Sequence, residues 1–243
     1  MGVLPNITIK KDIRLSMPKM PERLIVTGCD EKTEWQLFWF IDNYYKHNTI
    51  PMAIADFGMS EAMKNRIKTM NHPAVFCYMD IPVEEGVKGW FGKPQAMLSA
   101  PGKKCVWIDT DCEILGNIER IFNYIEPNKL TMAVDKPWLK RRGEIWHNSG
   151  VVGFMSKPEI LKKWAEQCKA NPEVGDQEVL HSMLNPITKI TYINDLPNEY
   201  NWLRLQVEHD NEDSPKKKIM HWTGQKGNDR IKGKMKIMEA IRA

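Results

Sequence analysis

The chain has 243 residues, of which 42% are hydrophobic and 27% charged, and its formal net charge is +4. This length and balance fit one sizeable α/β domain with a substantial core, and the small net charge does not indicate nucleic-acid binding. No apolar run approaches the ~18 residues of a membrane span, no signal-peptide core is present, and the five cysteines have no zinc-site spacing, so we expect a soluble, cytoplasmic protein.

The first 21 residues are polar and contain three prolines, which predicts an N-terminal arm before a single domain at residues 22–243. An apolar run predicts a first buried strand at 23–30, and apolar side chains at roughly helical spacing predict a helix over 32–47. A strand at 52–56, a helix at 60–70 with Ser60 as N-cap and a strand at 74–79 follow. This alternation predicts a parallel sheet with right-handed crossovers.

The pattern is less regular after residue 80. We expect a loop at 80–92, a helix at 93–100, a buried strand that ends at Asp109, a helix capped by Asn117 and running to 125, and a strand at 130–135. A basic connection at 136–142 and a strand at 148–155 precede a helix to 168, for which Ser156 and Glu159 have the spacing of a capping box. A helical segment from 176, a strand at 188–193, an exposed loop at 205–218, a strand at 218–222 and a C-terminal helix rich in Lys and Met complete the domain.

Asp109 and Asp111 interrupt an apolar run at the point where a predicted strand leaves the sheet. In parallel α/β sheets, the crevice beyond the carboxyl ends of the strands is where ligands bind. Two neighbouring carboxylates repel each other unless a cation lies between them, and divalent cations that prefer oxygen ligands satisfy this need. The alternative is that both residues are turn or cap residues, as aspartate often is at strand ends.

Four segments, taken in their order along the chain, resemble the motifs of glycosyltransferase family 8, a family of nucleotide-sugar glycosyltransferases of the GT-A type. They are Asp109-Thr110-Asp111, Asn148-Ser149-Gly150-Val151, Gly175-Asp176-Gln177 and His221-Trp222-Thr223-Gly224, with weaker matches at 27–32, 93–94, 196–197 and 200–202. The resemblance runs from about residue 24 to 228. It implies a GT-A-like (Rossmann-like) fold, with a mixed, mainly parallel sheet flanked by helices in a single domain.

The resemblance also implies an activity, the metal-dependent transfer of a hexose from a UDP-sugar with retention of configuration. Asp109, Asp111 and His221 would bind the metal. A mixed oxygen and imidazole set suits Mn²⁺, with Mg²⁺ as the alternative. The metal would stabilise negative charge on the leaving diphosphate as a Lewis acid. A histidine that is simply packed in the core is the alternative for His221.

The family pattern assigns roles to further residues, several of which also have a structural explanation. Nucleotide or phosphate binding would fall to Thr27, Asp30, Lys93, Thr110, Gly224 and Lys226, sugar binding to Asp135, Asn148 and Ser149, and catalysis to Asp176 and Gln177. The structural explanations are a turn for Asp30, an exposed charge for Lys93, the end of a strand for Asp135 and a helix cap for Asp176. Gly150 would allow the backbone to approach a ligand closely.

The segment around Lys226 departs from the family pattern, which has one more residue before the lysine and then a Pro-Trp pair. This chain has Gly227-Asn228 instead, so Lys226 is either a phosphate ligand or a solvated turn lysine. The acceptor is unknown and could be a saccharide, a protein or a lipid-linked molecule. Two other functions stay open, an NDP-sugar nucleotidyltransferase and a non-catalytic binder of nucleotides or sugars. The nucleotidyltransferase normally needs a Gly-rich, basic loop after the first strand, which residues 27–30 do not provide.

Overall fold

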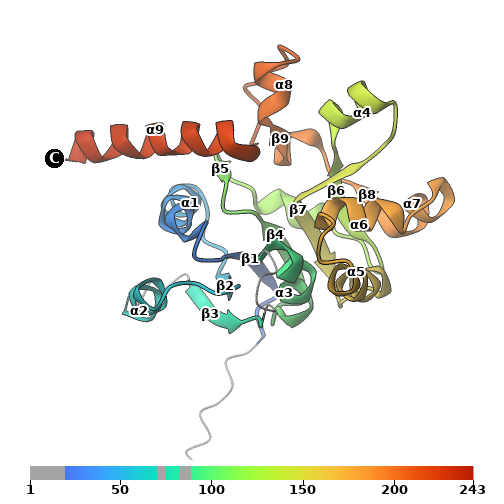
Figure 1. The fold of residues 1–243 in the computed structure, drawn as a ribbon, viewed down its shortest axis with the longest axis horizontal. Coiled ribbons are helices and arrows are strands. Elements are labelled where there is room, and N and C mark those ends of the chain that lie inside the picture. The colour runs from blue at the N-terminus through green and yellow to red at the C-terminus, as the bar shows by residue number, and fades with distance from the viewer. Residues whose placement is uncertain (1–19, 70–74, 83–88, 243) are drawn as a thin grey trace, which may run out of the picture.

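The structure, a computed structural model, describes residues 20–69, 75–82 and 89–242. Seven of the described strands form the central sheet in the order β3-β2-β1-β4-β7-β6-β8 (Figure 1). Their bounds are β1 Arg23–Cys29, β2 Met52–Asp56, β3 Val75–Asp80, β4 Lys104–Ile108, β6 Leu130–Val134, β7 His147–Met155 and β8 Ile193–Asp195. The strands β3, β2, β1 and β4 are mutually parallel, β7 is antiparallel to β4 and β6, and β8 is parallel to β6. This confirms an α/β fold with a mixed, mainly parallel sheet.

Helices cover both faces of the sheet, because its central strands are apolar on both sides. The helices are α1 (Leu37–Tyr45) and α2 (Glu61–Thr69) on one face, and α3 (Lys93–Ser99), α5 (Glu159–Ala170) and α6 (Asp176–Ser182) on the other. In β1, Ile25 packs into the core of the first face, whereas Leu24 and Val26 pack into the core of the second. The two cores fix the carboxyl ends of β1 and β4.

The strand order reverses beside β1, which is flanked by β2 on one side and by β4 on the other. The crevice beyond the carboxyl ends of β1 and β4 is therefore a topological switch point. A second sheet meets it there, in the order β5 (Cys112–Ile114), β10 (Ile219–His221) and β9 (Trp202–Leu203). The antiparallel register sets His221 opposite Cys112. A residue late in the chain thus joins the aspartates that follow β4.

The predicted C-terminal helix is confirmed as α9 (Gly224–Arg242), which follows β10 and extends away from the sheet (Figure 1). It begins at Gly224, whose φ of 72° is left-handed, so the expected turn at residues 224–227 is instead the first turn of the helix. Among the helices of the described residues, none combines the length and apolar character needed to cross a membrane.

The expected basic connection at 136–142 is wrong, because these residues form the helix α4 (Lys136–Arg142). Asp135 caps this helix by accepting a hydrogen bond from the backbone N–H of Trp138 at 3.0 Å, and Gly143 ends it at a φ of 71°. An aspartate before the first turn and a glycine after the last are the usual boundary residues of a helix. The sequence interpretation rested on the run of basic side chains and did not use these two boundary residues.

The expected strand at 188–193 is also wrong, because most of it belongs to the helix α7 (Pro186–Tyr192). The side chain of Asn185 accepts hydrogen bonds from the backbone N–H groups of Ile187 and Thr188 at 3.0 and 2.9 Å. This N-cap, with Pro186 at the start of the helix, outweighs the β-propensity of Thr, Ile and Tyr in the segment. The strand β8 begins only at Ile193.

Two further boundaries differ from expectation. Ser156 does not cap α5, because its φ is +54° and Pro158 occupies the N-cap position. Residues 205–218 are not simply an exposed loop, since the helix α8 (Arg204–Glu208) forms their first part. The fully buried side chain of Gln206 accepts a hydrogen bond from the backbone N–H of Leu203 at 3.1 Å and thereby fixes this turn.

The remaining elements agree in place, with changes of detail. The segment at 32–47 splits into a 3-10 turn, η1 (Glu34–Gln36), and α1. The helix expected after Asn117 is a 3-10 turn, η3 (Glu119–Tyr124), and the Asn117 side chain accepts the hydrogen bond from the Glu119 N–H. The loop at 80–92 ends in η2 (Gly89–Gly92), and η4 (Asn198–Tyr200) precedes β9. Residues 83–88, positions 70 and 74, and most of the predicted arm lie outside the described residues.

Candidate active site

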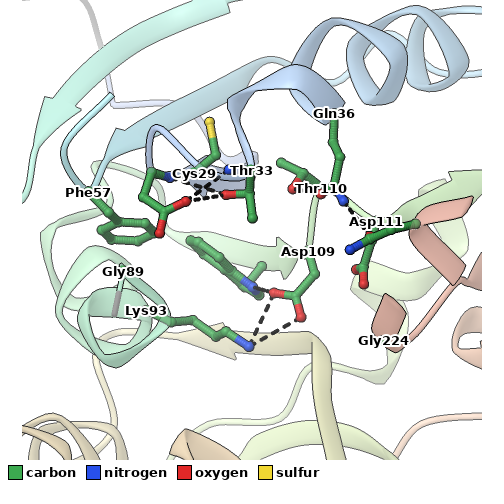
Figure 2. A pocket seen from close by; sticks show the side chains of 14 residues that line it. Cys29, Thr33, Gln36, Phe57, Gly89, Lys93, Asp109, Thr110, Asp111 and Gly224 are labelled. Carbon is green, nitrogen blue, oxygen red and sulfur yellow. Dashed lines mark hydrogen bonds and ion pairs between the residues drawn. The ribbon is translucent and has the colours of Figure 1, made fainter. Parts of the chain in front are cut away.

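Two cavities open beside each other at the switch point. The first, of about 260 Å³, lies beyond β1 and β4 and is lined by Asp30, Gln36, Phe57, Thr110, Gly224 and Asn228, among others (Figure 2). The second, of about 520 Å³, is lined by Asp135, Trp138, Asn148, Ser149, Asp176 and Gln177, among others. Lys93 and Asp109 line both, and Asp111 and His221 line one each. The predicted nucleotide and sugar residues thus fall largely into two adjoining spaces.

Lys93 connects the two cavities. Its Nζ lies 3.1 Å from Oδ1 of Asp109 and 3.1 Å from Oδ2 of Asp176, and it donates to the carbonyl oxygen of Ser149 at 3.3 Å. Figure 2 shows the side chain reaching Asp109 from the first turn of α3. Burial would lower the pKa of Lys93, but Asp109 and Asp176 raise it, so the group stays an ammonium. The alternative explanation of Lys93 as an exposed charge is wrong, because this residue is only 4% exposed.

Asp109 is held from both sides of its carboxylate. The indole N–H of Trp107 donates to its Oδ1 at 2.6 Å, and Lys93 contacts both oxygens. Burial and the nearby Asp111 raise the pKa of Asp109, whereas Lys93 lowers it. The carboxylates of Asp109, Asp111 and Asp176 carry three negative charges against one positive charge on Lys93, which leaves a formal charge of −2 before His221 is counted. This surplus favours a cation in the site.

His221 faces the aspartate pair. Its Nε2 lies 3.2 Å from Oδ1 of Asp111 and 4.0 Å from Oδ2 of Asp109. Burial would lower the pKa of His221, but the two carboxylates raise it above its ordinary value. Oδ1 of Asp111 is buried and receives no well-directed hydrogen bond from the described residues. Positive charge is therefore favoured between these three groups, as a proton on Nε2 or as a metal ion.

The protonation of the His221 ring follows from a chain of hydrogen bonds that starts at the backbone. The N–H of Gly150 donates to Oδ1 of Asn148 at 3.0 Å, which identifies that atom as the amide oxygen. Asn201 donates its Nδ2 hydrogen to the same oxygen at 2.9 Å, so its own Oδ1 is left as an acceptor 3.0 Å from Nδ1 of His221. Nδ1 must then carry the hydrogen. Nε2, which faces the aspartates, is the nitrogen available to a metal.

The predicted sugar residues form one polar network in the second cavity. Nδ2 of Asn148 donates to Oε1 of Gln177 at 3.1 Å and to Oδ2 of Asp135 at 3.3 Å. Gln177 also accepts from the backbone N–H of Ser149 at 3.1 Å and donates to Oδ2 of Asp135 at 3.3 Å. Asp135 also caps α4 through its other oxygen, so the same carboxylate fixes the start of the helix and lines the second cavity. The network presents a fixed set of donors and acceptors to the cavity.

The first cavity has its own polar wall. Thr110 donates to Oε1 of Gln36 at 2.8 Å, and Gln36 donates to Oδ1 of Asn228 at 2.8 Å. Asp30 uses Oδ1 to accept hydrogen bonds from the backbone and hydroxyl of Thr33 at 3.0 and 2.7 Å. The turn explanation for Asp30 is therefore correct, although the residue also lines the cavity. Gln36 and Asn228 were missed because nothing in the sequence relates positions 192 apart. Thr33 was missed although it is only three residues from Asp30.

Three predicted residues have a different environment from the one expected. Thr27 lies inside the sheet, where its hydroxyl donates to the carbonyl of Ile108 at 2.7 Å and its exposure is 0%. Lys226 is exposed on the first turn of α9 and is not among the residues that line the first cavity. Gly150 lines the second cavity, but a Cβ at this position would fall on the ring of His221, so the group that approaches it closely is the imidazole. The missing side chain makes room for the imidazole.

The comparisons with known proteins identify the fold. No family model matches the chain, and no curated protein matches it. Among solved structures, the galactosyltransferase LgtC in complex with donor and acceptor sugar analogues aligns with a TM-score of 0.58 and 15% identity, over 83% of this chain and 87% of LgtC. The glycosyltransferase GlyE of Streptococcus pneumoniae TIGR4 aligns with a TM-score of 0.60 and 16% identity, over 84% of this chain and 55% of GlyE.

The bifunctional glycosyltransferase WbbM gives a TM-score of 0.61 at 13% identity, over 87% of this chain and 47% of WbbM. The chain therefore spans about half the length of GlyE and WbbM. The likeness confirms the GT-A-type fold that the sequence resemblance implied. At such low sequence identities, structural similarity shows the fold alone, so the function has to be argued from the site.

Proposed function

We propose that this chain is a metal-dependent glycosyltransferase, which transfers a hexose from a UDP-sugar to an acceptor with retention of configuration. The observation that carries the proposal is the group formed by Asp109, Asp111 and His221 between two adjoining cavities. A nucleotide would occupy the first cavity and a sugar the second, so that the bond between them lies beside the three metal-ligating groups. The shared fold of the structural neighbours supports this reading.

The proposed metal is Mn²⁺, with Mg²⁺ as the alternative. The donor set of two carboxylates and one imidazole suits Mn²⁺. The formal charge of −2 on Lys93 and the three carboxylates of Asp109, Asp111 and Asp176 matches a divalent ion. When bound, the ion would supply Lewis-acid stabilisation of the leaving diphosphate. Asp109 and Asp111 need act neither as nucleophile nor as base.

Residues of the first cavity would hold the nucleotide. Oδ1 of Asp30 is used by Thr33, and the other carboxylate oxygen remains to accept the N3–H of uracil, which favours UDP over a purine nucleotide. Gly28 lines the cavity and lets Ala55 and Phe57 pack closely against the strand, and Phe57 gives an apolar surface for the base. Thr110 and Gly224 would contact the diphosphate, while Lys226 would not, because it is exposed outside the cavity.

Residues of the second cavity would orient the sugar. Asp135, Asn148 and Gln177 form one network whose donors and acceptors can each select a hydroxyl group. Asp176 pairs with Lys93 and lies where it can stabilise positive charge on the sugar ring. Because Asp135 and Asp176 are both engaged in this way, neither is free to act as a general base. This favours a front-face reaction in which the leaving phosphate receives the acceptor proton, the course that gives retention.

A screen of nucleotide sugars tests the proposal. Purified protein is incubated with UDP-hexoses and with purine-nucleotide sugars, in Mn²⁺ or in EDTA, and the released nucleoside diphosphate is measured in each case. We expect release only with UDP-sugars and metal, and NMR of the product should show the donor's anomeric configuration. Metal-linked UDP binding by calorimetry without any turnover would instead favour the non-catalytic binder. Pyrophosphate-dependent formation of UTP would favour the nucleotidyltransferase.

Asn201→Leu is expected to weaken Mn²⁺ binding about 10–100-fold, the usual effect of losing a group that orients a metal ligand. Leucine cannot accept the Nδ1 hydrogen of His221, so the ring loses its fixed orientation and tautomer. Asn201→Asp keeps an acceptor at this position and is expected to retain most of the affinity. Free Mn²⁺ measured by electron paramagnetic resonance gives both values. Equal affinity in the leucine variant and the unaltered protein would contradict the role of Asn201.

Gly150→Ala is expected to displace the imidazole of His221 and lower Mn²⁺ affinity at least about tenfold. The added Cβ would overlap Cε1 and Nδ1 of the ring. Gly153→Ala is the matched control in the same strand, because its Cβ would meet Ile125 and Thr131 instead, at 2.9 and 3.2 Å. Both variants should lose about 1–3 kcal/mol of stability through overpacking. Only the first should change metal binding, as measured by calorimetry.

A further inference from the structure

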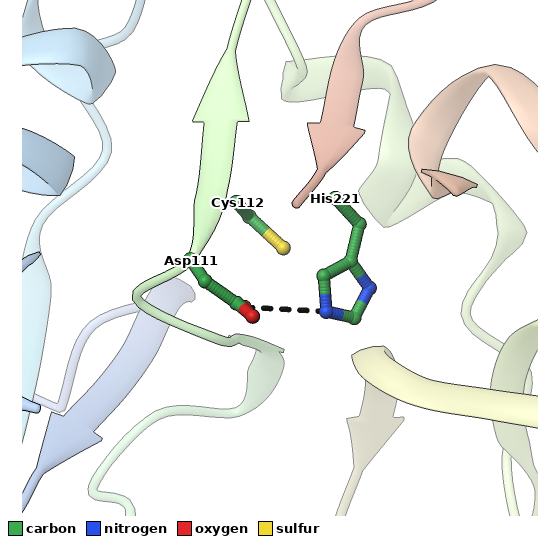
Figure 3. Close-up of side chains that lie close together, drawn as sticks. All are labelled: Asp111, Cys112 and His221. Atoms are coloured by element: carbon green, nitrogen blue, oxygen red, sulfur yellow. Dashed lines mark ion pairs between the residues drawn. The ribbon is translucent and has the colours of Figure 1, made fainter. Parts of the chain in front are cut away.

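Cys112 adds a sulfur atom to the group that faces the cavities. The Cys112 Sγ, a carboxylate oxygen of Asp111 and a ring nitrogen of His221 all lie within 4.8 Å of one another. Figure 3 shows the thiol pointing into the space between the other two side chains. Cys112 begins β5 and is paired across the sheet with His221, so the backbone holds the sulfur and the imidazole on the same side.

The donor atoms of this cluster differ in chemistry from those of the proposed Mn²⁺ site. A carboxylate, an imidazole and a thiolate form a typical zinc set, whereas Mn²⁺ prefers oxygen ligands. Asp111 and His221 belong to both sets. An ion bound through Cys112 would therefore use two of the three groups that the proposed function requires.

We propose that Cys112 gives this site a second, thiophilic binding mode, in which Asp111, Cys112 and His221 bind Zn²⁺, Cd²⁺ or Co²⁺ and thereby exclude Mn²⁺. The metal–sulfur bond forms as the thiol proton passes to the buffer. Because the two modes share ligands, binding is competitive, and such ions would inhibit the proposed transferase. The inhibition rests on the proposed function, whereas the binding does not.

The geometry permits this mode with small movements. A tetrahedral ion with bonds of about 2.3 Å to sulfur and about 2.0 Å to nitrogen holds its ligand atoms roughly 3.5 Å apart. The three atoms are already within 4.8 Å, so side-chain shifts of about 1 Å suffice. Asp111 lies in the short turn between β4 and β5, and the paired β5 and β10 backbones carry the other two ligands, so the adjustment falls on side-chain torsions.

The test uses the full chain and Co²⁺ as a spectroscopic probe. A cobalt–thiolate bond gives a near-ultraviolet charge-transfer band, and Zn²⁺ affinity follows from competition with a chromophoric chelator. We expect the band in the unaltered chain and its loss in Cys112→Val, with the ratio of Zn²⁺ to Mn²⁺ affinity falling at least tenfold. Cys105→Val is the control, because Cys105 is a buried strand cysteine outside the cluster, and it should keep the band.

The outcomes separate this proposal from the proposed function. Cys112→Ala provides a second variant if the valine variant does not fold. A band that persists in the folded Cys112 variant, or Zn²⁺ affinity that is unchanged there, overturns the thiophilic mode. A Cys112-dependent band in a chain that turns over no UDP-sugar leaves the mode standing and refutes the transferase. Turnover in Mn²⁺ with no cobalt–thiolate band refutes the mode alone.

Discussion

Asp111→Asn is expected to lower kcat/KM for the UDP-sugar by at least ~10³-fold, more than the 10–100-fold typical of residues that only support a metal ligand. The amide keeps the size of the side chain but removes one of the negatively charged ligands of the proposed ion. It also removes the carboxylate that faces Nε2 of His221 at 3.2 Å. Rates measured across a range of Mn²⁺ concentrations separate lost metal binding from lost chemistry, because high Mn²⁺ restores only the former.

Asp80→Asn is the matched control for this variant. Asp80 also stands at the carboxyl end of a parallel strand, β3, but it is exposed and lines neither cavity. Its variant should keep full activity. Both variants should melt close to the unaltered protein, and Asp111→Asn should lose no stability, because it removes a negative charge from a cluster with a surplus of them. Equal activity of the two variants would contradict the metal site.

Mn²⁺ affinity is expected to rise with pH until His221 is neutral. The carboxylates of Asp111 and Asp109 raise the pKa of His221, so a proton on Nε2 competes with the ion at the same nitrogen. Raising the pH through that pKa removes the competitor, and each bound ion should release fewer protons at high pH than at low pH. Calorimetry in buffers of different ionisation enthalpy counts these protons. Affinity that falls as the pH rises would contradict imidazole ligation.

The sequence predicted those parts of the fold and site that depend on local patterns. The apolar run before Asp109 identified β4, and an interruption by two aspartates identified the end of the strand. The position of His221 next to them depends on pairing between β5 and β10, more than 100 residues apart, and was available only through the family resemblance. Local signals also failed where two of them competed, as at Asn185, whose capping box outweighs the β-branched residues after it.

The residues that were missed or misplaced share a different cause, which is contact between distant segments. Gln36 and Asn228 meet across 192 positions, and nothing in either segment marks them as partners. A close approach at Gly150 was predicted, and the structure shows the ring of His221 in that position beside the second cavity. Lys93 was placed near phosphates, whereas its burial between two carboxylates depends on the packing of α3 against the sheet.

Lys93→Met is expected to destabilise the protein by about 3–5 kcal/mol at pH 8, the usual cost of removing one partner from a buried ion pair. Methionine keeps the length and apolar stem, but the carboxylates of Asp109 and Asp176 then lose the ammonium that lies 3.1 Å from each. Urea unfolding gives the stability. Lys103→Met is the control, because Lys103 is 61% exposed in its pair with Glu22, and its loss should cost less than about 1 kcal/mol.

The pH dependence of the Lys93→Met variant distinguishes lost charge pairing from lost packing. Burial raises the pKa of Asp109, and Lys93 is the group that lowers it, so loss of the ammonium leaves the pKa of Asp109 further above its value in the unfolded chain. The folded variant then binds more protons than the unfolded one, so its stability rises as the pH falls from 8 towards 5. The deficit relative to the unaltered protein should shrink over that range, and Asp176→Asn added to the variant should shrink it at pH 8. A deficit that is constant with pH and insensitive to Asp176→Asn would show that Lys93 stabilises the site only by filling space.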